Sequence, residues 1–142
     1  MLSADYIVGL TDGEGSFTVY LRPPGGSRGG KNYKIECHYY VKLREEDFGL
    51  LLKVKKFFGC GNVYFQRDPR INHTDCYRYE VSNLQKISEV IIPFFRSHQL
   101  ESGIRMKDFK LFCKIVDMVK RKKHLTKDGL IKIEKLKSQM HK

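Results

Sequence analysis

The stretch that decides the fold of this chain begins at Tyr6 and reads Tyr6-Ile7-Val8-Gly9-Leu10-Thr11-Asp12-Gly13-Glu14-Gly15-Ser16-Phe17. Its first part is almost wholly apolar and follows Ser3, a good N-cap residue, which predicts a buried helix over about residues 4–13. The helix ends in a glycine-rich corner that carries Asp12 and Glu14. Because the C-terminal end of a helix is its negative end, two carboxylates there favour a cation, and hard divalent ions take such oxygen ligands. The spacing alone also fits an ordinary turn between a helix and a strand.

Two glycines give the same helix one bare face. Gly9 and Gly13 stand four residues apart and therefore lie above one another on the helix surface. Because they lack a Cβ atom, another backbone can approach them very closely.

The composition predicts one soluble domain over residues 1–142. The chain is 41% hydrophobic and 30% charged, it has no apolar run long enough to span a membrane, and its start does not resemble a signal peptide. We therefore expect an intracellular protein with no membrane partner, in the cytoplasm of a prokaryote or in an organelle.

The charge balance indicates a partner that is a polyanion. Lysine and arginine number 27 against 16 aspartates and glutamates, which gives a net charge of +11. Anionic lipid is the rival to nucleic acid, but no basic amphipathic helix with an aromatic apolar face stands out. Nucleic acid is the better interpretation, and a basic structural or lipid-surface protein remains an alternative.

The four cysteines do not predict a metal site. Cys37, Cys60, Cys76 and Cys113 are irregularly spaced, and neither a Cys-x-x-Cys pair nor a zinc-type spacing to histidine occurs. We expect reduced thiols without a catalytic role, as in a reducing compartment.

Alternating and helical patterns predict the order helix, strand, strand, helix, strand, strand, helix, followed by two C-terminal helices. Strands are expected at residues 16–22, 33–44, 63–67 and 75–81, and helices at 45–58, 84–95, about 105–123 and about 126–141. The fold class is therefore α+β, with a four-stranded antiparallel sheet covered by helices on one face.

The other face of the sheet is expected to be open and basic, as a surface that reads bases and holds phosphates requires. A merely solvated strand face would show the same alternation. The candidate DNA-binding side chains on the strands and their loops are Tyr20, Arg22, Arg28, Lys31, Lys34, His38, Tyr40, Lys42, Arg44, Gln66, Arg70 and Arg78.

The signature stretch resembles that of the LAGLIDADG homing endonucleases, in the variant that ends Asp-Gly-Glu-Gly followed by a small residue and Phe. Gly13 stands where the family name has alanine, and Glu14 stands for the final aspartate; both keep the residue type. His124-Leu125-Thr126 with Gly129-Leu130 resembles the family's C-terminal pattern, so the likeness extends over nearly the whole chain. The resemblance implies an αββαββα domain whose curved sheet lies on DNA as a saddle.

The resemblance also implies a catalytic set. Glu14 is the expected ligand of Mg²⁺, with the Gly13 carbonyl oxygen beside it and Asp12 nearby. The family's active-site basic residue falls on Arg105, two residues after a glycine, and Lys107 is the neighbouring alternative. An arginine keeps the positive charge but does not readily donate a proton.

The signature occurs once, which in the family implies a homodimer. Its helices pair through residues that here are Ile7, Gly9, Leu10 and Gly13. The implied activity is a metal-dependent double-strand break with short 3′ overhangs at a long, near-palindromic DNA site. The alternative within the fold is a module that does not cut and instead binds DNA, or acts like a maturase in the splicing of intron RNA; RNA is the less favoured partner.

Overall fold

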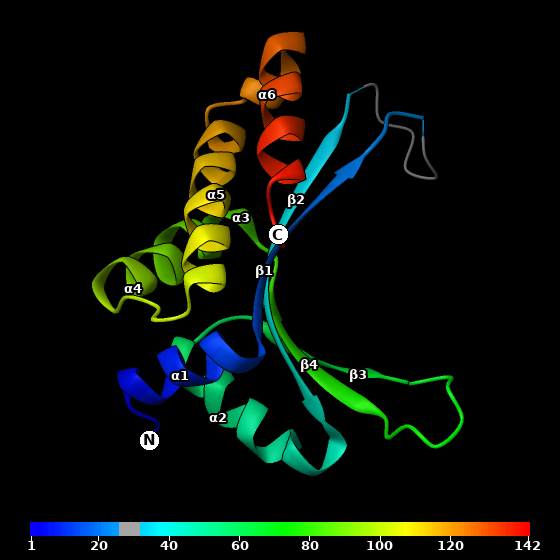
Figure 1. The fold of residues 1–142 in the computed structure, drawn as a ribbon, viewed down its shortest axis with the longest axis vertical. Helices are drawn as coiled ribbons and strands as arrows, with labels where there is room; N and C mark the ends of the chain where they lie inside the picture. The colour runs from blue at the N-terminus through cyan, green and yellow to red at the C-terminus, as the bar shows by residue number, and fades with distance from the viewer. Residues whose placement is uncertain (26–31) are drawn as a thin grey trace.

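The computed structural model describes residues 1–25 and 32–142, which form helices and one four-stranded sheet (Figure 1). In chain order the elements are α1 (Ala4–Glu14), β1 (Gly15–Arg22), β2 (Lys34–Arg44), the 3₁₀ turn η1 (Glu45–Asp47), α2 (Phe48–Phe58), β3 (Asn62–Gln66), β4 (Cys76–Val81), α3 (Leu84–Lys86), the π-helical η2 (Ile87–Ile91), α4 (Ile92–Ser97), α5 (Gly103–Lys120), the 3₁₀ turn η3 (Lys123–Leu125) and α6 (Lys127–Ser138).

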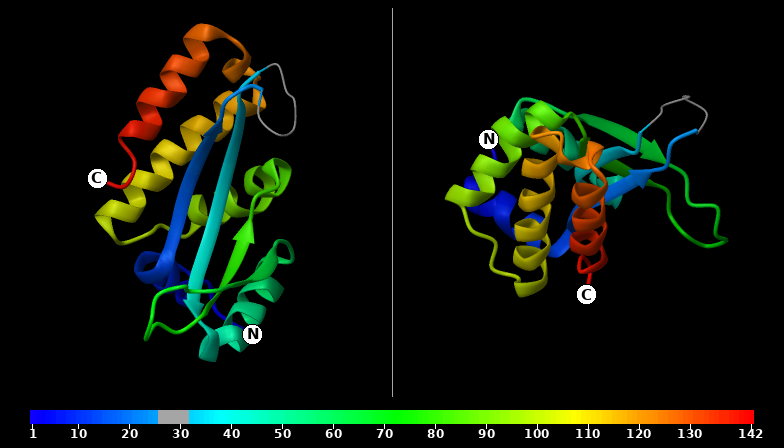
Figure 2. Two further views of the ribbon diagram at one scale, coloured as in Figure 1. Left: turned by 90° about the vertical axis from the view of Figure 1, so that its right-hand side faces the viewer. Right: turned by 90° about the horizontal axis from the view of Figure 1, so that it is seen from above.

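The sheet joins two hairpins along their second strands. Its order is β1-β2-β4-β3, and every neighbouring pair is antiparallel. The strands bend as they cross, and the helices gather on one side of the sheet (Figure 2). The predicted fold class, a four-stranded antiparallel sheet with helices on one face, is confirmed.

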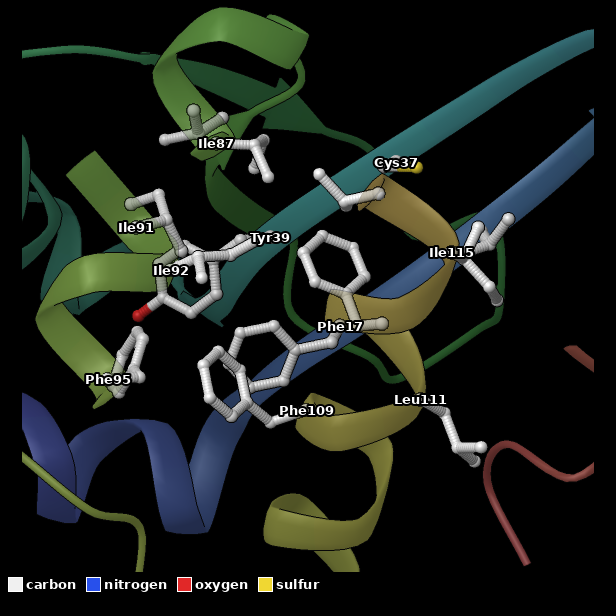
Figure 3. Packing of buried hydrophobic residues seen from close by; sticks show 14 of the residues in the cluster. Phe17, Cys37, Tyr39, Ile87, Ile91, Ile92, Phe95, Phe109, Leu111 and Ile115 are labelled. Carbon is white, nitrogen blue, oxygen red and sulfur yellow. The ribbon is translucent and has the colours of Figure 1, made fainter. Parts of the chain in front are cut away.

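An aromatic cluster fills the space between sheet and helices. Phe17 of β1 is completely buried, and its ring lies 5.2–5.5 Å from those of Tyr39, Phe95, Phe109 and Phe112. These rings come from β2, α4 and α5, so one residue of β1 connects the sheet to two helices (Figure 3). Burying an aromatic side chain this fully contributes on the order of 2–3 kcal/mol.

The signature helix α1 is fixed to the sheet by both apolar and polar contacts. Ser3 accepts a hydrogen bond from the Tyr6 amide at 3.1 Å and so caps the helix as predicted. Thr11 is fully buried, and its hydroxyl lies 2.8 Å from that of Tyr39 on β2. The position of the corner after Thr11 is therefore set by the sheet.

Several helix boundaries differ from the prediction. Residues 45–47, predicted as the first turn of the helix that ends at Phe58, form the separate 3₁₀ turn η1. The segment predicted as a helix over 84–95 continues to Ser97 and contains a π-helical stretch before Pro93, which lies in the first turn of α4. Proline is tolerated in a first turn because its missing amide needs no partner there. The helix α5 ends at Lys120 rather than near 123, because Lys122 adopts a left-handed conformation with φ of 59°.

No helix within residues 1–25 and 32–142 is long and apolar enough to cross a membrane. All four cysteines are free. Burial raises the pKa of the Cys37 thiol to about 12 and that of Cys113 to about 11, so both stay protonated at neutral pH.

Candidate active site and open sheet face

Glu14 ends the signature helix with an exposed carboxylate. It is the last residue of α1, and β1 begins at the next residue. A Cβ atom on Gly15 would stand 2.7–2.9 Å from atoms of Thr11, so only glycine allows the strand to start this close to the helix. The last turn of α1 holds no basic residue, so nothing within that turn offsets the negative helix end beside the carboxylate.

Asp12, two residues earlier, faces a different partner. Its two carboxylate oxygens accept hydrogen bonds from the backbone amides of Glu101 and Ser102, at 3.0 and 3.1 Å. These amides immediately precede α5: Ser102 is its N-cap, and Glu101 is the residue before it. The contacts give Asp12 a role in holding α5 against α1 and favour that role over a catalytic one.

Arg105 of α5 makes a further contact with α1. Its Nε donates to the carbonyl oxygen of Thr11 at 3.3 Å, and its own amide donates to the N-cap hydroxyl of Ser102. The guanidinium group therefore lies at the negative end of α1, the end that carries Glu14. The Nζ of Lys107 instead lies 3.5 Å from the Lys142 carbonyl oxygen, at the C-terminal end of the chain. Of the two predicted basic residues, Arg105 is therefore the one that contacts the end of α1 near Glu14.

The glycine face of α1 is open. A Cβ atom on Gly9 or Gly13 would meet nothing within 4 Å among the described residues, and Leu10 is only partly buried. A hollow of about 480 Å³ lies beside this face, between α1 and the connection from α4 to α5. Ile7 is completely buried in the protomer, so the prediction that it contributes to a dimer surface is wrong. An almost wholly apolar helix does not reveal which of its apolar residues turn inward.

Nine of the candidate DNA-binding side chains belong to the strand face opposite the helices, as the alternation predicted. Their strand positions alternate with the buried ones, and the cross-strand register places them beside one another; they are Tyr20, Arg22, Lys34, His38, Tyr40, Lys42, Arg44, Gln66 and Arg78. Two further candidates, Arg28 and Lys31, lie outside the described residues. Arg70 lies in the connection between β3 and β4 and is held by both carboxylate oxygens of Asp68.

Two carboxylates organise the middle of this open face. His38 lies 2.9 Å from an oxygen of Glu80 and 3.3 Å from one of Glu36. Arg78 pairs with Glu80 at 3.0 Å and stacks on Tyr40, with 3.5 Å from its Cζ to the ring centroid. The Arg78 Nε is buried and has no hydrogen-bond acceptor among the described residues.

Glu36 forms the other side of this network. Burial raises its pKa, but the hydrogen bond from Arg22 and the charges of Arg22, Lys34 and His38 outweigh burial and hold the pKa below its usual value. The carboxylate therefore stays ionised and reduces the positive charge of the face.

Among the residues of this face that were not candidates are Glu36, Tyr64 and Glu80. All three stand on the exposed side of the strand alternation, so the pattern contained the signal. The contact of Glu80 with His38 depends on the register of separate strands, which a single strand does not reveal.

The described residues of one protomer contain no group of three histidine, cysteine, aspartate or glutamate side chains that is able to hold a metal ion. The donors at the corner are the exposed Glu14 carboxylate and backbone carbonyls, which are hard oxygen ligands and fit Mg²⁺ or Ca²⁺. The set fits such an ion but requires further ligands from outside one protomer.

Comparison with known families gives one match over residues 7–116, to the family described as LAGLIDADG endonuclease. The probable intron-encoded endonuclease 2 of Neurospora crassa is 31% identical over 133 residues, which cover 93% of this chain and 28% of that protein. An uncharacterized 50.9 kDa protein in ND4 intron 1 of Podospora anserina is 28% identical over 124 residues, or 86% of this chain and 25% of that protein. The chain thus spans about a quarter of the length of these curated relatives.

Solved structures show the same fold. The homing endonuclease I-TnaI is 33% identical, with a TM-score of 0.81 over 99% of this chain and 89% of that chain. I-SmaMI bound to cleaved DNA is 28% identical, with a TM-score of 0.85 over 100% of this chain and 45% of that chain.

Proposed function

Because this chain belongs to the LAGLIDADG endonuclease family, we propose that it is a homing endonuclease that cuts both strands of DNA at a long, near-palindromic site. The observation that carries the proposal is the exposed Glu14 carboxylate at the negative end of α1, at the point where the chain enters the open sheet face. The cut leaves short 3′ overhangs.

The working enzyme is a homodimer that holds Mg²⁺ at this corner. The open glycine face of α1 supports pairing with a second copy, which would add Glu14 of the partner subunit. The ligands from this chain are the Glu14 carboxylate and the Gly13 carbonyl oxygen. When bound, the ion polarises the scissile phosphate and lowers the pKa of a water molecule that it holds.

The remaining residues position and stabilise the substrate. Arg105 supplies a fixed positive charge at the end of α1, where it counters the charge of the phosphate and does not transfer a proton. The strand face holds the DNA through its lysines, arginines and tyrosines. Asp12 keeps α5, and with it Arg105, in register with Glu14.

The activity is tested by cleavage of a pooled DNA library in Mg²⁺ beside a Ca²⁺ control, with the ends sequenced. We expect recurrent cuts in Mg²⁺ at one nearly two-fold symmetric sequence. Selective binding in both metals without cutting would contradict the nuclease and identify a DNA-binding member of the fold.

The active carboxylate is tested by Glu14→Gln, which removes the charge and keeps the shape. We expect cleavage to fall at least about 100-fold, since losing a direct ligand costs more than the 10–100-fold typical of residues behind one. Binding of the target should persist. The matched control is Glu46→Gln, the same change at another exposed acid in η1. Full cutting by Glu14→Gln would refute the site.

The dimer is tested by leucine at Gly9 and Gly13. The described protomer has space for both side chains, so the monomer should stay folded while the dimer and the cutting are lost. Gly49→Leu on α2 is the control, because its Cβ position is equally open. Sedimentation velocity gives the masses, and an unchanged dimer would place the interface elsewhere.

The relatives named as intron-encoded support an origin within an intron, and we place the protein inside the cell or an organelle on that basis.

A further inference from the structure

The positive charge of the chain is concentrated in its C-terminal helices. Residues 103–142 hold 13 of the 27 lysines and arginines but only 4 of the 16 aspartates and glutamates. They therefore carry +9 of the net charge of +11, although they make up less than a third of the chain.

These cations are exposed and mostly unpaired with acids. Along α5 the exposed lysines Lys107, Lys110 and Lys114 recur at helical spacing, and Lys132 and Lys135 are exposed on α6. Within residues 103–142, which are all described, the only lysine or arginine in an ion pair is Arg121, which contacts Asp117.

One of the four acids does not offset this charge at the surface. Asp108 is 1% exposed and is engaged by the amide and the ring of His141, at 2.8 and 3.0 Å.

The open sheet face differs in this respect. There Glu36 pairs with Arg22, and Glu80 pairs with Arg78, so part of its positive charge is neutralised within the protein. The face suits contacts that discriminate between bases, but it is a weaker source of general attraction for phosphates than the C-terminal helices.

The two helices form a long cationic surface. Figures 1 and 2 show α5 and α6 side by side on the helix side of the sheet. With 18 residues, α5 is about 27 Å long, a length over which duplex DNA presents on the order of 15 phosphate charges. The aromatic side chains of α5, Phe109 and Phe112, are buried, and α6 has none, so this surface lacks the aromatic anchors of a membrane-binding helix.

We propose that the outer surface of α5 and α6 is a second DNA-binding surface, which holds duplex DNA by its phosphates without reading sequence. The choice of DNA as the partner rests on the proposed function. This surface supplies most of the salt-dependent affinity and keeps the protein on DNA while the sheet face searches for its site.

The test replaces three exposed lysines, Lys110, Lys114 and Lys135, by glutamine. The matched control makes the same three changes on α2, at Lys53, Lys55 and Lys56, which are also exposed. Affinity for a duplex of unrelated sequence is measured against salt concentration, without divalent metal. Each lost phosphate contact lowers the slope of log affinity against log salt by about 0.9, so we expect a decrease of about 2 to 3 for the α5–α6 variant. The α2 variant should keep the parental slope.

Equal decreases in both variants would overturn the proposal, because net charge alone would then explain them. An unchanged slope for duplex DNA would also overturn it; if the same variant then lost binding to an RNA hairpin or to phosphatidylserine vesicles, that polyanion would be the partner. Failure of the parent protein to cut any DNA would refute the nuclease but not the surface, since the slope is measured without cutting.

Discussion

The two αββ units of this molecule have the same order of elements, yet their first helices end in opposite ways. The helix α2 has Lys55 and Lys56 in its last turn and stops at Gly59, whose φ of 72° is the left-handed conformation of a common helix end. The helix α1 has no basic residue in its last turn, ends on Glu14 and passes directly into β1 at Gly15. The ending of α2 satisfies its helix, whereas the ending of α1 leaves a carboxylate where the helix disfavours it. Such a local conflict marks a functional position.

The strands of the two units differ as well. Phe17 of β1 is completely buried, whereas Phe65 of β3 is 54% exposed, and its ring lies 5.4 Å from that of Tyr77 on the neighbouring strand β4. The unit that carries the signature is therefore also the one that is held most firmly, as a site that must keep its geometry requires.

The largest difference between the units is expected from matched aromatic deletions. Phe17→Ala should lower the free energy of unfolding by about 3–5 kcal/mol, because it leaves a cavity among four rings. Phe65→Ala, at an exposed site, should cost less than about 1 kcal/mol. Urea denaturation measures both, and similar losses would contradict the contrast between the units. If Phe17→Ala does not fold, Phe17→Leu is compared with Phe65→Leu, and the loss of unfolding free energy should again be larger at Phe17.

The two helix ends are compared by Gly15→Ala and Gly59→Ala. At Gly15 the new Cβ would overlap the backbone of Thr11, so the corner must shift, at a cost of about 1–3 kcal/mol. At Gly59 there is space, and only the left-handed conformation is penalised, by about 1 kcal/mol. Only Gly15→Ala should also slow DNA cleavage, since it moves Glu14. Equal activity in the two variants would show that the corner tolerates displacement.

The sequence predicted the first unit better than the contacts between units. Strict alternation identified the buried and open sides of β1 and β2, and Ser3 and Gly59 marked helix ends by known chemistry. The role of Asp12 was not predictable, because its partners are amides 89 and 90 residues away. Nor does one strand reveal that Glu80 meets His38, since that pairing depends on how β2 and β4 align.

Asp12 has no counterpart at the end of α2, and its replacement tests whether α5 is positioned through α1. Asp12→Asn keeps the size but leaves two backbone amides with one good acceptor, so we expect about 1–3 kcal/mol of destabilisation. The cleavage rate should fall more in Asp12→Asn than in Ser102→Ala, because Ser102 caps only α5. Saturating DNA would not restore the rate if the geometry at Arg105 is lost. A stability change without any change in rate would limit Asp12 to a structural role.

The smallest effect is expected on the open face of the first hairpin, where Glu36 of β2 pairs with Arg22 of β1. The pKa of Glu36 is lower in the folded chain than its ordinary value of 4.5, so its contribution to stability is present above pH 4.5 and is lost as the pH falls below it. Because the Arg22 side chain is 56% exposed, the pair should contribute less than about 1 kcal/mol. Glu36→Gln should therefore lower the melting temperature at pH 7 by a few degrees, and this difference should shrink as the pH falls below 4.5. Glu46→Gln, outside this network, is the control.

Since Glu36→Gln also removes a negative charge from the open face, it should tighten binding to duplex DNA at pH 7. Lower stability of the Glu36→Gln variant together with stronger DNA binding would show two effects of this carboxylate. It orders the side chains of the open face, and it weakens the attraction of that face for phosphates.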